Sequence, residues 1–156
     1  IMPLNGTNTN RTQELTRELT VQILQLNRFE VVDHYKVATL VEDEGLEGID
    51  LSDTLVKNIA RKLQADAILL GEITNFQEPE SPYPLLRKPP FIGLSLRIVS
   101  INQTMPMTIW SMNDTFDSRD RQVKQYVKRS GRRRLNTDPY FLIQVVAKEI
   151  AKTFAF

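Results

Sequence analysis

The chain has 156 residues, which fits a single domain over residues 1–156, and its 41% hydrophobic and 25% charged residues are ordinary globular composition. The formal net charge of +1 argues against a chain that is basic throughout and binds nucleic acid by charge alone. The lack of cysteine and the single histidine, His34, exclude disulfides, thiolate metal sites and a cysteine nucleophile, and argue against a zinc site.

The first elements expected along the chain are a strand end and an amphipathic helix. Residues 1–4 form a short apolar run that reads as the end of a buried strand, so we expect further residues before it. Leucine or isoleucine recurs every three to four residues between Leu15 and Leu26, which is the spacing of one helix face. Asn10 and Gln13 resemble a capping box, which places the start of this helix at Asn10.

Three further elements follow. Residues 29–34 read as a short strand, because they combine aromatic and β-branched side chains. The apolar positions within residues 37–41 suggest a short helix that Gly45 closes. Asp50 is a good N-cap, and the apolar stripe after it predicts a strong amphipathic helix over residues 51–63.

A central strand covered on both faces is expected next. Residues 67–71 are a continuous apolar run, which is typical of such a strand. The alternation over residues 72–76 indicates that the strand continues beyond its covered centre. Residues 78–90 contain five of the eight prolines and are predicted to be a loop, since proline cannot pair within a central strand.

A long β-hairpin and a final helix complete the predicted fold. Alternating apolar residues over 92–100 and 107–116 predict two strands, which the turn between them makes antiparallel. Residues 120–135 are rich in charge and are expected to begin as a helix, and Asp138 followed by Pro139 predicts the start of the last helix. The order of elements indicates an α/β (α+β) fold in which helices pack on a mixed sheet.

The sequence contains no catalytic motif. It has no glycine-rich nucleotide-binding loop, no Walker A sequence, no nucleophile elbow and no H-E-x-x-H pair. His34 could transfer protons, but a surface histidine is the simpler interpretation, because its strand neighbour Asp33 would point to the opposite face. The acidic residues within 42–47 match no calcium loop, and Glu72 lacks a facing carboxylate for glycoside hydrolysis. We therefore expect a protein that is not an enzyme and uses no cofactor and no metal.

One segment is strongly basic. It comprises Lys124, Lys128, Arg129, Arg132, Arg133 and Arg134. Such a segment can bind nucleic acid, acidic lipid headgroups or another anionic polymer, and the fork geometry of arginine suits phosphate. The simpler interpretation is a solvated helix end and loop. The candidate partner-binding residues in this segment are Arg129, Arg132, Arg133 and Arg134.

The proline-rich loop, residues 78–90, is the second candidate contact surface. Its Tyr83, Leu85 and Leu86 place apolar side chains among prolines, a form suited to docking on a partner protein. The alternative is a rigid connector between two strands.

Four segments carry a resemblance to known proteins. They are PLNGT (3–7), FEVVDHYKVATLVEDEGLEG (29–48), LVKNIARKLQADAILLGEITNFQ (55–77) and GLSLRIVSINQTMPMTIWS (93–111). Their order and sequence resemble periplasmic lipoproteins related to the curli secretion channel subunit, activator lipoproteins of peptidoglycan synthases, and the amino-terminal domain of TolB. The chain departs from that pattern in two features. The hairpin turn lacks the usual Thr-Gly pair, and the chain does not contain the lipid-bearing cysteine expected before the domain.

The resemblance implies a TolB amino-terminal-like fold and a role in the bacterial envelope. It implies a periplasmic protein, anchored to the outer membrane by a lipid attached upstream. Such a protein would bind envelope proteins, associate with itself, and scaffold or regulate a secretion or assembly machine without a small-molecule substrate. The alternative function is a module for nucleic acid or another anionic polymer that uses the basic residues 124–134.

Overall fold

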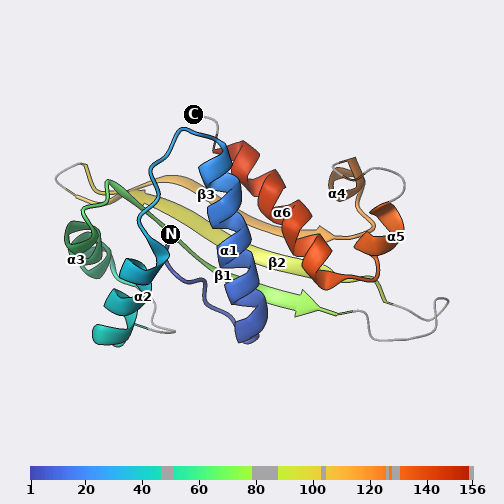
Figure 1. The fold of residues 1–156 in the computed structure, drawn as a ribbon, viewed down its shortest axis with the longest axis horizontal. Coiled ribbons are helices and arrows are strands. Elements are labelled where there is room, and N and C mark those ends of the chain that lie inside the picture. Colours follow the sequence, from blue (N-terminus) through green and yellow to red (C-terminus); the bar gives the residue numbers. More distant parts are fainter. Residues whose placement is uncertain (47–50, 79–87, 103–104, 126, 128–130, 155–156) are drawn as a thin grey trace.

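The structure is a computed structural model in which three long strands form an antiparallel sheet in the order β1–β2–β3 (Figure 1). It describes residues 1–46, 51–78, 88–102, 105–125, 127 and 131–154. The strands are β1 (Ala67–Gln77), β2 (Phe91–Ser100) and β3 (Met107–Asp117). The pairing of β2 with β3 is irregular at one place, where Ile109 is an extra residue on β3.

The first five residues run beside β1 and cover part of its other edge. The N–H of Met2 donates to the carbonyl oxygen of Leu69 at 3.1 Å. The N–H of Asn5 donates to Gly71 at 2.9 Å, and the Asn5 carbonyl oxygen accepts from Ile73 at 2.8 Å. The pairing is parallel and amounts to a single bridge, at Asn5. The predicted strand end is therefore present as a short strand-like segment.

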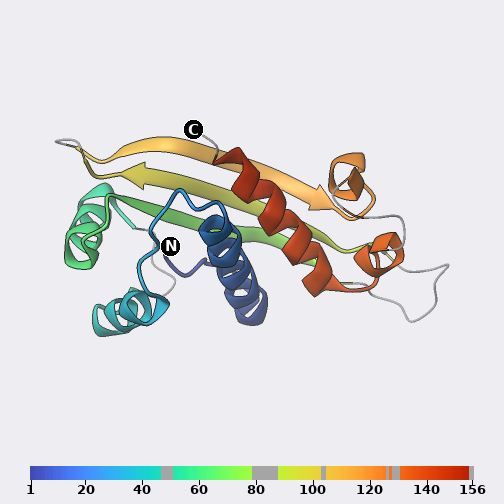
Figure 2. The same cartoon turned by 45° about the horizontal axis from the view of Figure 1, so that its top comes forward.

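Two long helices cover one face of the sheet. α1 (Thr9–Gln25) and α6 (Pro139–Thr153) lie side by side across it (Figures 1 and 2). The side chains of Ile92, Leu94 and Leu96 on β2 face these helices and are 2% exposed or less. This alternation along β2 was predicted, and it builds the larger of two apolar cores.

Two shorter helices cover the other face at one end only. α2 (His34–Asp43) and α3 (Asp53–Leu63) enclose a second, smaller core with apolar side chains of β1 and β2. Ile68 and Leu70 belong to this smaller core, whereas Leu69 belongs to the larger one. The prediction that this run is covered on both faces is therefore confirmed. The predicted central place in the sheet is wrong, because β1 pairs with a strand, β2, on one side and has only the bridge at Asn5 on the other.

The two remaining helices lie at the opposite end of the sheet from α3. α4 (Arg121–Gln125) and α5 (Arg132–Leu135) follow the end of β3 (Figure 2). Val123 of α4 and Leu135 of α5 contribute to the larger core. The fold is α+β, as predicted, and its sheet is antiparallel apart from the bridge at Asn5.

The predicted strand over residues 29–34 is wrong. Residues 29–33 have no regular structure, and His34 begins α2. The carboxylate of Asp33 accepts a hydrogen bond from the N–H of Tyr35 at 2.9 Å and caps the helix. The cap satisfies an N–H group that has no partner within the helix, so Asp33 favours a helix start over a strand here.

Two predicted helix starts are displaced, whereas a third is confirmed. α1 is capped by Asn8, not Asn10, because the Asn8 side chain accepts from the N–H of Arg11 at 3.2 Å. Ser52 caps α3, and the predicted cap Asp50 lies outside the described residues. Asp138 caps α6 as predicted, with Pro139 as its first residue.

We expect Leu19→Ala to lower the free energy of unfolding by about 2–5 kcal/mol, because Leu19 is 0% exposed and its loss leaves a cavity under α1. Leu24→Ala, the same change on the same helix, should cost no more than about 0.5 kcal/mol, since Leu24 is 47% exposed. Chemical denaturation followed by the fluorescence of Trp110 measures both values. Equal losses would contradict the buried face assigned to α1.

Candidate interaction surfaces

The edge of the sheet on the outer side of β1 is closed near the start of that strand. The first residues of the chain occupy it, and Pro3 has no N–H to offer. The N–H of Leu4 donates to the hydroxyl oxygen of Thr16 on α1 at 3.2 Å, in a buried position. A further strand therefore cannot pair with the outer side of Pro3 and Leu4.

The opposite edge, β3, is open. Figure 2 shows β3 as the outermost strand, and among the described residues no strand pairs with its outer side. Its residues 107–113 contain no charge and no proline, and the bulge at Ile109 is the one common device for protecting an edge strand among them. Exposed apolar side chains gather at its start, where Met105 is 75%, Met107 44% and Ile109 45% exposed. β3 is therefore an edge at which another strand can add.

The described part of the basic segment lies in α4 and α5, at one end of the molecule (Figure 1). Lys124 belongs to α4. Arg132 and Arg133 belong to α5, but their side chains lie outside what the structure describes, as do residues Lys128 and Arg129 altogether. The predicted role of Arg129, Arg132 and Arg133 in partner binding therefore stays a prediction.

Arg134 is engaged in contacts within the domain. Its Nε donates to the carboxylate of Asp138 at 2.8 Å, and its guanidinium carbon lies 4.8 Å from the ring centroid of Phe141. Burial by itself would raise the pKa of Asp138, but the hydrogen bonds from Arg134 and from the N–H of Phe141 outweigh it and lower that pKa. Arg134 therefore stabilises the start of α6, whatever further contact it makes.

Opposite charges gather in two segments of the sequence. Residues 117–139, which include α4 and α5, contain eight lysines and arginines and three aspartates. Residues 42–53, which connect α2 to α3, contain six aspartates and glutamates and no lysine or arginine. Glu44 of this acidic segment forms an ion pair with Lys62 of α3. The net charge of +1 thus combines a basic and an acidic segment of the sequence.

The proline-rich loop is attached at the basic end. It precedes β2, whose first residue, Phe91, pairs with Asp117 at the end of β3. Tyr83, Leu85 and Leu86 lie outside the described residues, so their docking role also stays a prediction.

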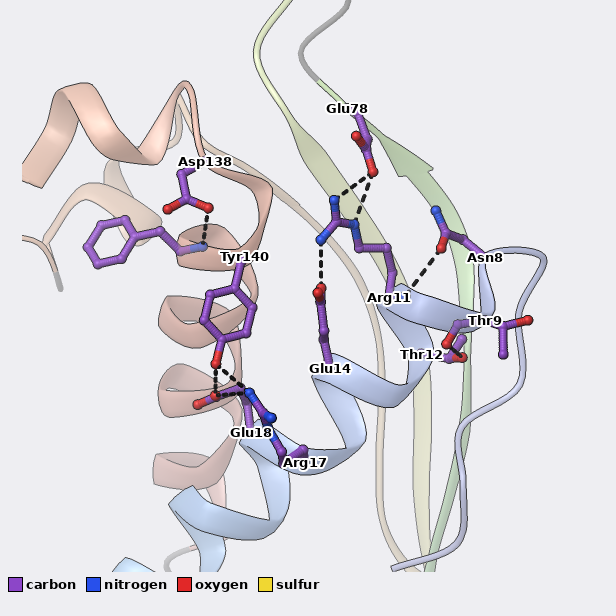
Figure 3. Close-up of polar contacts among 11 residues, drawn as sticks. Asn8, Thr9, Arg11, Thr12, Glu14, Arg17, Glu18, Glu78, Asp138 and Tyr140 are labelled. Atoms are coloured by element: carbon purple, nitrogen blue, oxygen red, sulfur yellow. Dashed lines mark hydrogen bonds and ion pairs between the residues drawn. The ribbon is translucent and has the colours of Figure 1, made fainter.

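Polar side chains join α1 to α6 (Figure 3). The hydroxyl of Tyr140 on α6 donates to the carboxylate of Glu18 on α1 at 2.5 Å. Arg17 donates from Nη2 to the Tyr140 oxygen at 2.8 Å. Glu18 is only 9% exposed, so the hydrogen bond from Tyr140 replaces contacts with water that packing has removed. This cluster holds two helices together and is structural in character.

A second polar contact ties the start of α1 to the end of β1. Arg11 donates to Glu14 at 2.7 Å and to Glu78 at 2.8 Å (Figure 3), and its guanidinium carbon lies 5.6 Å from the Phe76 ring centroid. Burial by itself would lower the pKa of Arg11, but the two carboxylates outweigh it and raise that pKa.

A broad groove of about 1810 Å³ lies beside the first residues of the chain, with α1, α2 and the sheet lining it. Arg97 in its lining donates to the carbonyl oxygen of Leu51 at 3.3 Å and is thus engaged within the domain. His34 also lines the groove, but the neighbouring carboxylate of Asp33 caps α2. In the part of the chain that the structure describes, no hydrogen bond joins His34 to a carboxylate, as a catalytic dyad would require.

Among the described residues, no group of three or more histidine, cysteine, aspartate or glutamate side chains could hold a metal ion. None of the helices described has both the length and the apolar character needed to cross a bilayer.

Comparison with known proteins supports the fold and gives no information on function. No protein-family model matches the chain, and no curated protein matches it. Its structure is similar to that of the hypothetical protein CT253 from Chlamydia trachomatis, with a TM-score of 0.56 and 15% sequence identity. The match covers 97% of this chain and 84% of that one. At this identity the likeness shows a shared fold, and the resemblance to envelope lipoproteins stays a prediction.

Glu149 of α6 holds an unpaired polar atom. Its Oε2 is enclosed without a hydrogen-bond partner among the described residues. Burial is the main cause that raises the pKa of Glu149, and the charge of Asp114 on β3 adds to it, while Lys152 opposes it. Because its pKa is raised in the folded state, the ionised carboxylate destabilises the fold at neutral pH.

We expect Glu149→Gln to raise the free energy of unfolding at pH 7, because the variant removes a partly buried charge. The gain should shrink as the pH falls through the raised pKa and vanish below about 4.5, where the carboxyl is protonated in both states. Urea denaturation at several pH values tests this. A gain that does not change with pH would show that charge at Glu149 is not its cause.

Thr16→Val should lower the free energy of unfolding by about 1–3 kcal/mol, because it leaves the buried N–H of Leu4 without an acceptor. Thr20→Val is the matched control, since the Thr20 hydroxyl donates only within α1, to the carbonyl oxygen of Thr16. Hydrogen exchange of the Leu4 amide should speed up in the first variant alone. An unchanged exchange rate would contradict the role of Thr16 in closing this edge.

Proposed function

We propose that this domain is a non-catalytic interaction module of the bacterial envelope that binds protein partners by strand addition at β3. The observation that carries the proposal is the contrast between the two edges of the sheet. One edge is closed near its start by Pro3 and Thr16, whereas the other is long, uncharged over residues 107–113 and exposes methionines near its start. Strand addition supplies main-chain hydrogen bonds, and alternate side chains supply specificity.

The envelope location is part of the proposal. It is supported by the sequence resemblance of segments 29–48, 55–77 and 93–111 to periplasmic lipoproteins. These segments include α2, most of α3 with β1, and most of the β2–β3 hairpin. On this proposal the protein sits in the periplasm, is held at the outer membrane by an upstream lipid, and acts as an accessory part of a secretion or assembly machine.

A second candidate function is the binding of nucleic acid or another anionic polymer at the α4–α5 end. The observation that favours it is the sequence of residues 117–139, which contain α4 and α5 and hold eight lysines and arginines against three aspartates. Lysine and arginine in such a segment can pair with the charges of an anionic polymer. Binding of this kind weakens steeply as salt concentration rises.

The first experiment is a crosslinking pull-down of the full-length protein from native envelopes at low and at high salt. Capture of envelope proteins that resists high salt is the result expected from strand addition, whose hydrogen bonds are little screened. Capture of nucleic acid that high salt removes would favour the second function. Absence of the protein from the envelope fraction would overturn the proposed location.

Two variants sharpen the pull-down. Ile109→Lys introduces a charge on the exposed edge and should abolish the salt-resistant protein capture, because an inserted lysine opposes edge pairing. The double variant Arg132→Glu, Arg133→Glu should leave that capture unchanged. The opposite pattern, with capture lost only in the double variant, would refute strand addition at β3 and favour anion binding.

A further inference from the structure

We infer that the open part of the sheet face binds the C-terminal carboxylate of a partner peptide through Arg97. This site is separate from the β3 edge and goes beyond the proposed function. It lies in the groove of about 1810 Å³, whose lining includes residues of all three strands. A peptide bound there would lie over the face of the sheet, whereas an added strand would lie beside β3.

The polar side chains on the floor of this groove come from paired positions of the sheet. Arg97 of β2 pairs with Ser111 of β3, and Ser95 of β2 pairs with Asn113 of β3 and with Glu72 of β1. Because residues that face each other across two strands share one face of the sheet, all five side chains lie on the same side. That side is opposite to the larger core, and all five residues line the groove.

Arg97 differs from the other arginines of the groove in its partners. Arg11 and Arg17, which also line it, each lie within ion-pair distance of a glutamate. The half-buried Arg97 instead donates from Nη2 to the neutral carbonyl oxygen of Leu51 at 3.3 Å. In the part of the chain that the structure describes, no carboxylate pairs with Arg97. Its remaining N–H donors suit the two oxygens of a carboxylate.

The surroundings of Arg97 suit the end of a peptide. Leu70 pairs with Arg97 across the strands, and Leu51 accepts its hydrogen bond. Both leucines are part of the smaller core or pack against it, and both line the groove. The last side chain of a peptide held at Arg97 would therefore meet apolar surface. Ser95 and Ser111 place hydroxyl groups beside Arg97 for the backbone of the preceding residues.

Other properties of the groove favour a peptide over other anions. The exposed carboxylates of Glu42 and Glu72 line it and would repel a polyanion, whereas a peptide can bring a single carboxylate to Arg97. Its volume of about 1810 Å³ exceeds the roughly 300–1,000 Å³ of pockets for small ligands. No phenylalanine, tyrosine or tryptophan is among the described residues that line it, so nucleic-acid bases or sugar rings would find no such side chain for stacking.

The test uses the full chain and two pools of random hexapeptides as probes. One pool has free C-terminal carboxylates, and the other has C-terminal amides. Peptides that the immobilised protein retains are identified by mass spectrometry. We expect retention from the carboxylate pool alone, with apolar residues enriched at the last position. Equal retention from both pools, or retention from neither, would overturn the inference.

Variants of Arg97 test its role with the most enriched peptide, by fluorescence polarisation. Arg97→Gln should weaken binding by about tenfold to hundredfold, because hydrogen bonds to a charged group are lost. Arg97→Lys should lose only part of this, since lysine keeps the charge but not the fork. Arg61→Gln is the matched control, because Arg61 is an exposed residue of α3 that does not line the groove. An equal loss in Arg61→Gln would refute the role of Arg97.

A change at Ser111 tests the site with Arg97 in place. Ser111 faces Arg97 across the strands, with Cβ atoms about 4.5–5.5 Å apart. Ser111→Asp therefore supplies an internal carboxylate to the guanidinium and should abolish peptide binding. Ser111→Asn, with an uncharged side chain of the same shape, should keep the affinity within about threefold. Since Ser111 is exposed, both variants should fold. Undiminished binding by Ser111→Asp would contradict the site.

Ile109→Lys separates this site from the proposed use of the β3 edge. Ile109 is not among the residues that line the groove. The variant should therefore lose the capture of envelope proteins and still bind the selected peptide. If it loses peptide binding as well, the peptide binds at the β3 edge and the groove site is wrong. If it keeps both, the groove site stands and the proposed use of the edge fails.

Discussion

The hydrogen bonds that the first five residues make with β1 determine how the rest of the sheet can be used. They place the first residues along the start of one edge of a three-stranded sheet. Pro3 and the hydroxyl of Thr16 close the outer side of this added segment. Since no strand pairs with β3 on its outer side among the described residues, that side has unpaired backbone groups. The proposed binding at β3 follows from this asymmetry of the sheet.

The two apolar cores explain why the sheet is covered unequally. β2 presents apolar residues to α1 and α6 along its whole length, so that face requires continuous cover. On the other face, apolar residues of the sheet such as Ile68, Leu70 and Val99 gather near α3, and α2 and α3 are sufficient to bury them. The remaining sheet surface includes exposed polar residues such as Glu72 and Asn113, which water can solvate without a helix above them.

Much of the fold was predictable because it depends on local periodicity. The apolar stripe of α1, the alternation along β2 and the proline after Asp138 each fix an element from neighbouring residues alone. The prediction failed at residues 29–34, where strand-forming side chains compete with a helix cap. Asp33 supplies that cap through hydrogen bonds to N–H groups two and three residues later. Propensity alone does not show which of two local interactions prevails.

The sequence by itself determined the α+β class, most helices and strands, and the lack of a recognisable catalytic motif. It also identified the basic segment, but its interpretation of Arg134 was incomplete, because the contacts of Arg134 with Asp138 and Phe141 depend on how α5 meets α6. Only the tertiary structure decided which edge of the sheet is closed near its start. Edge closure depends on a contact between Leu4 and Thr16, which lie on different elements, and no periodicity along the chain encodes such a contact.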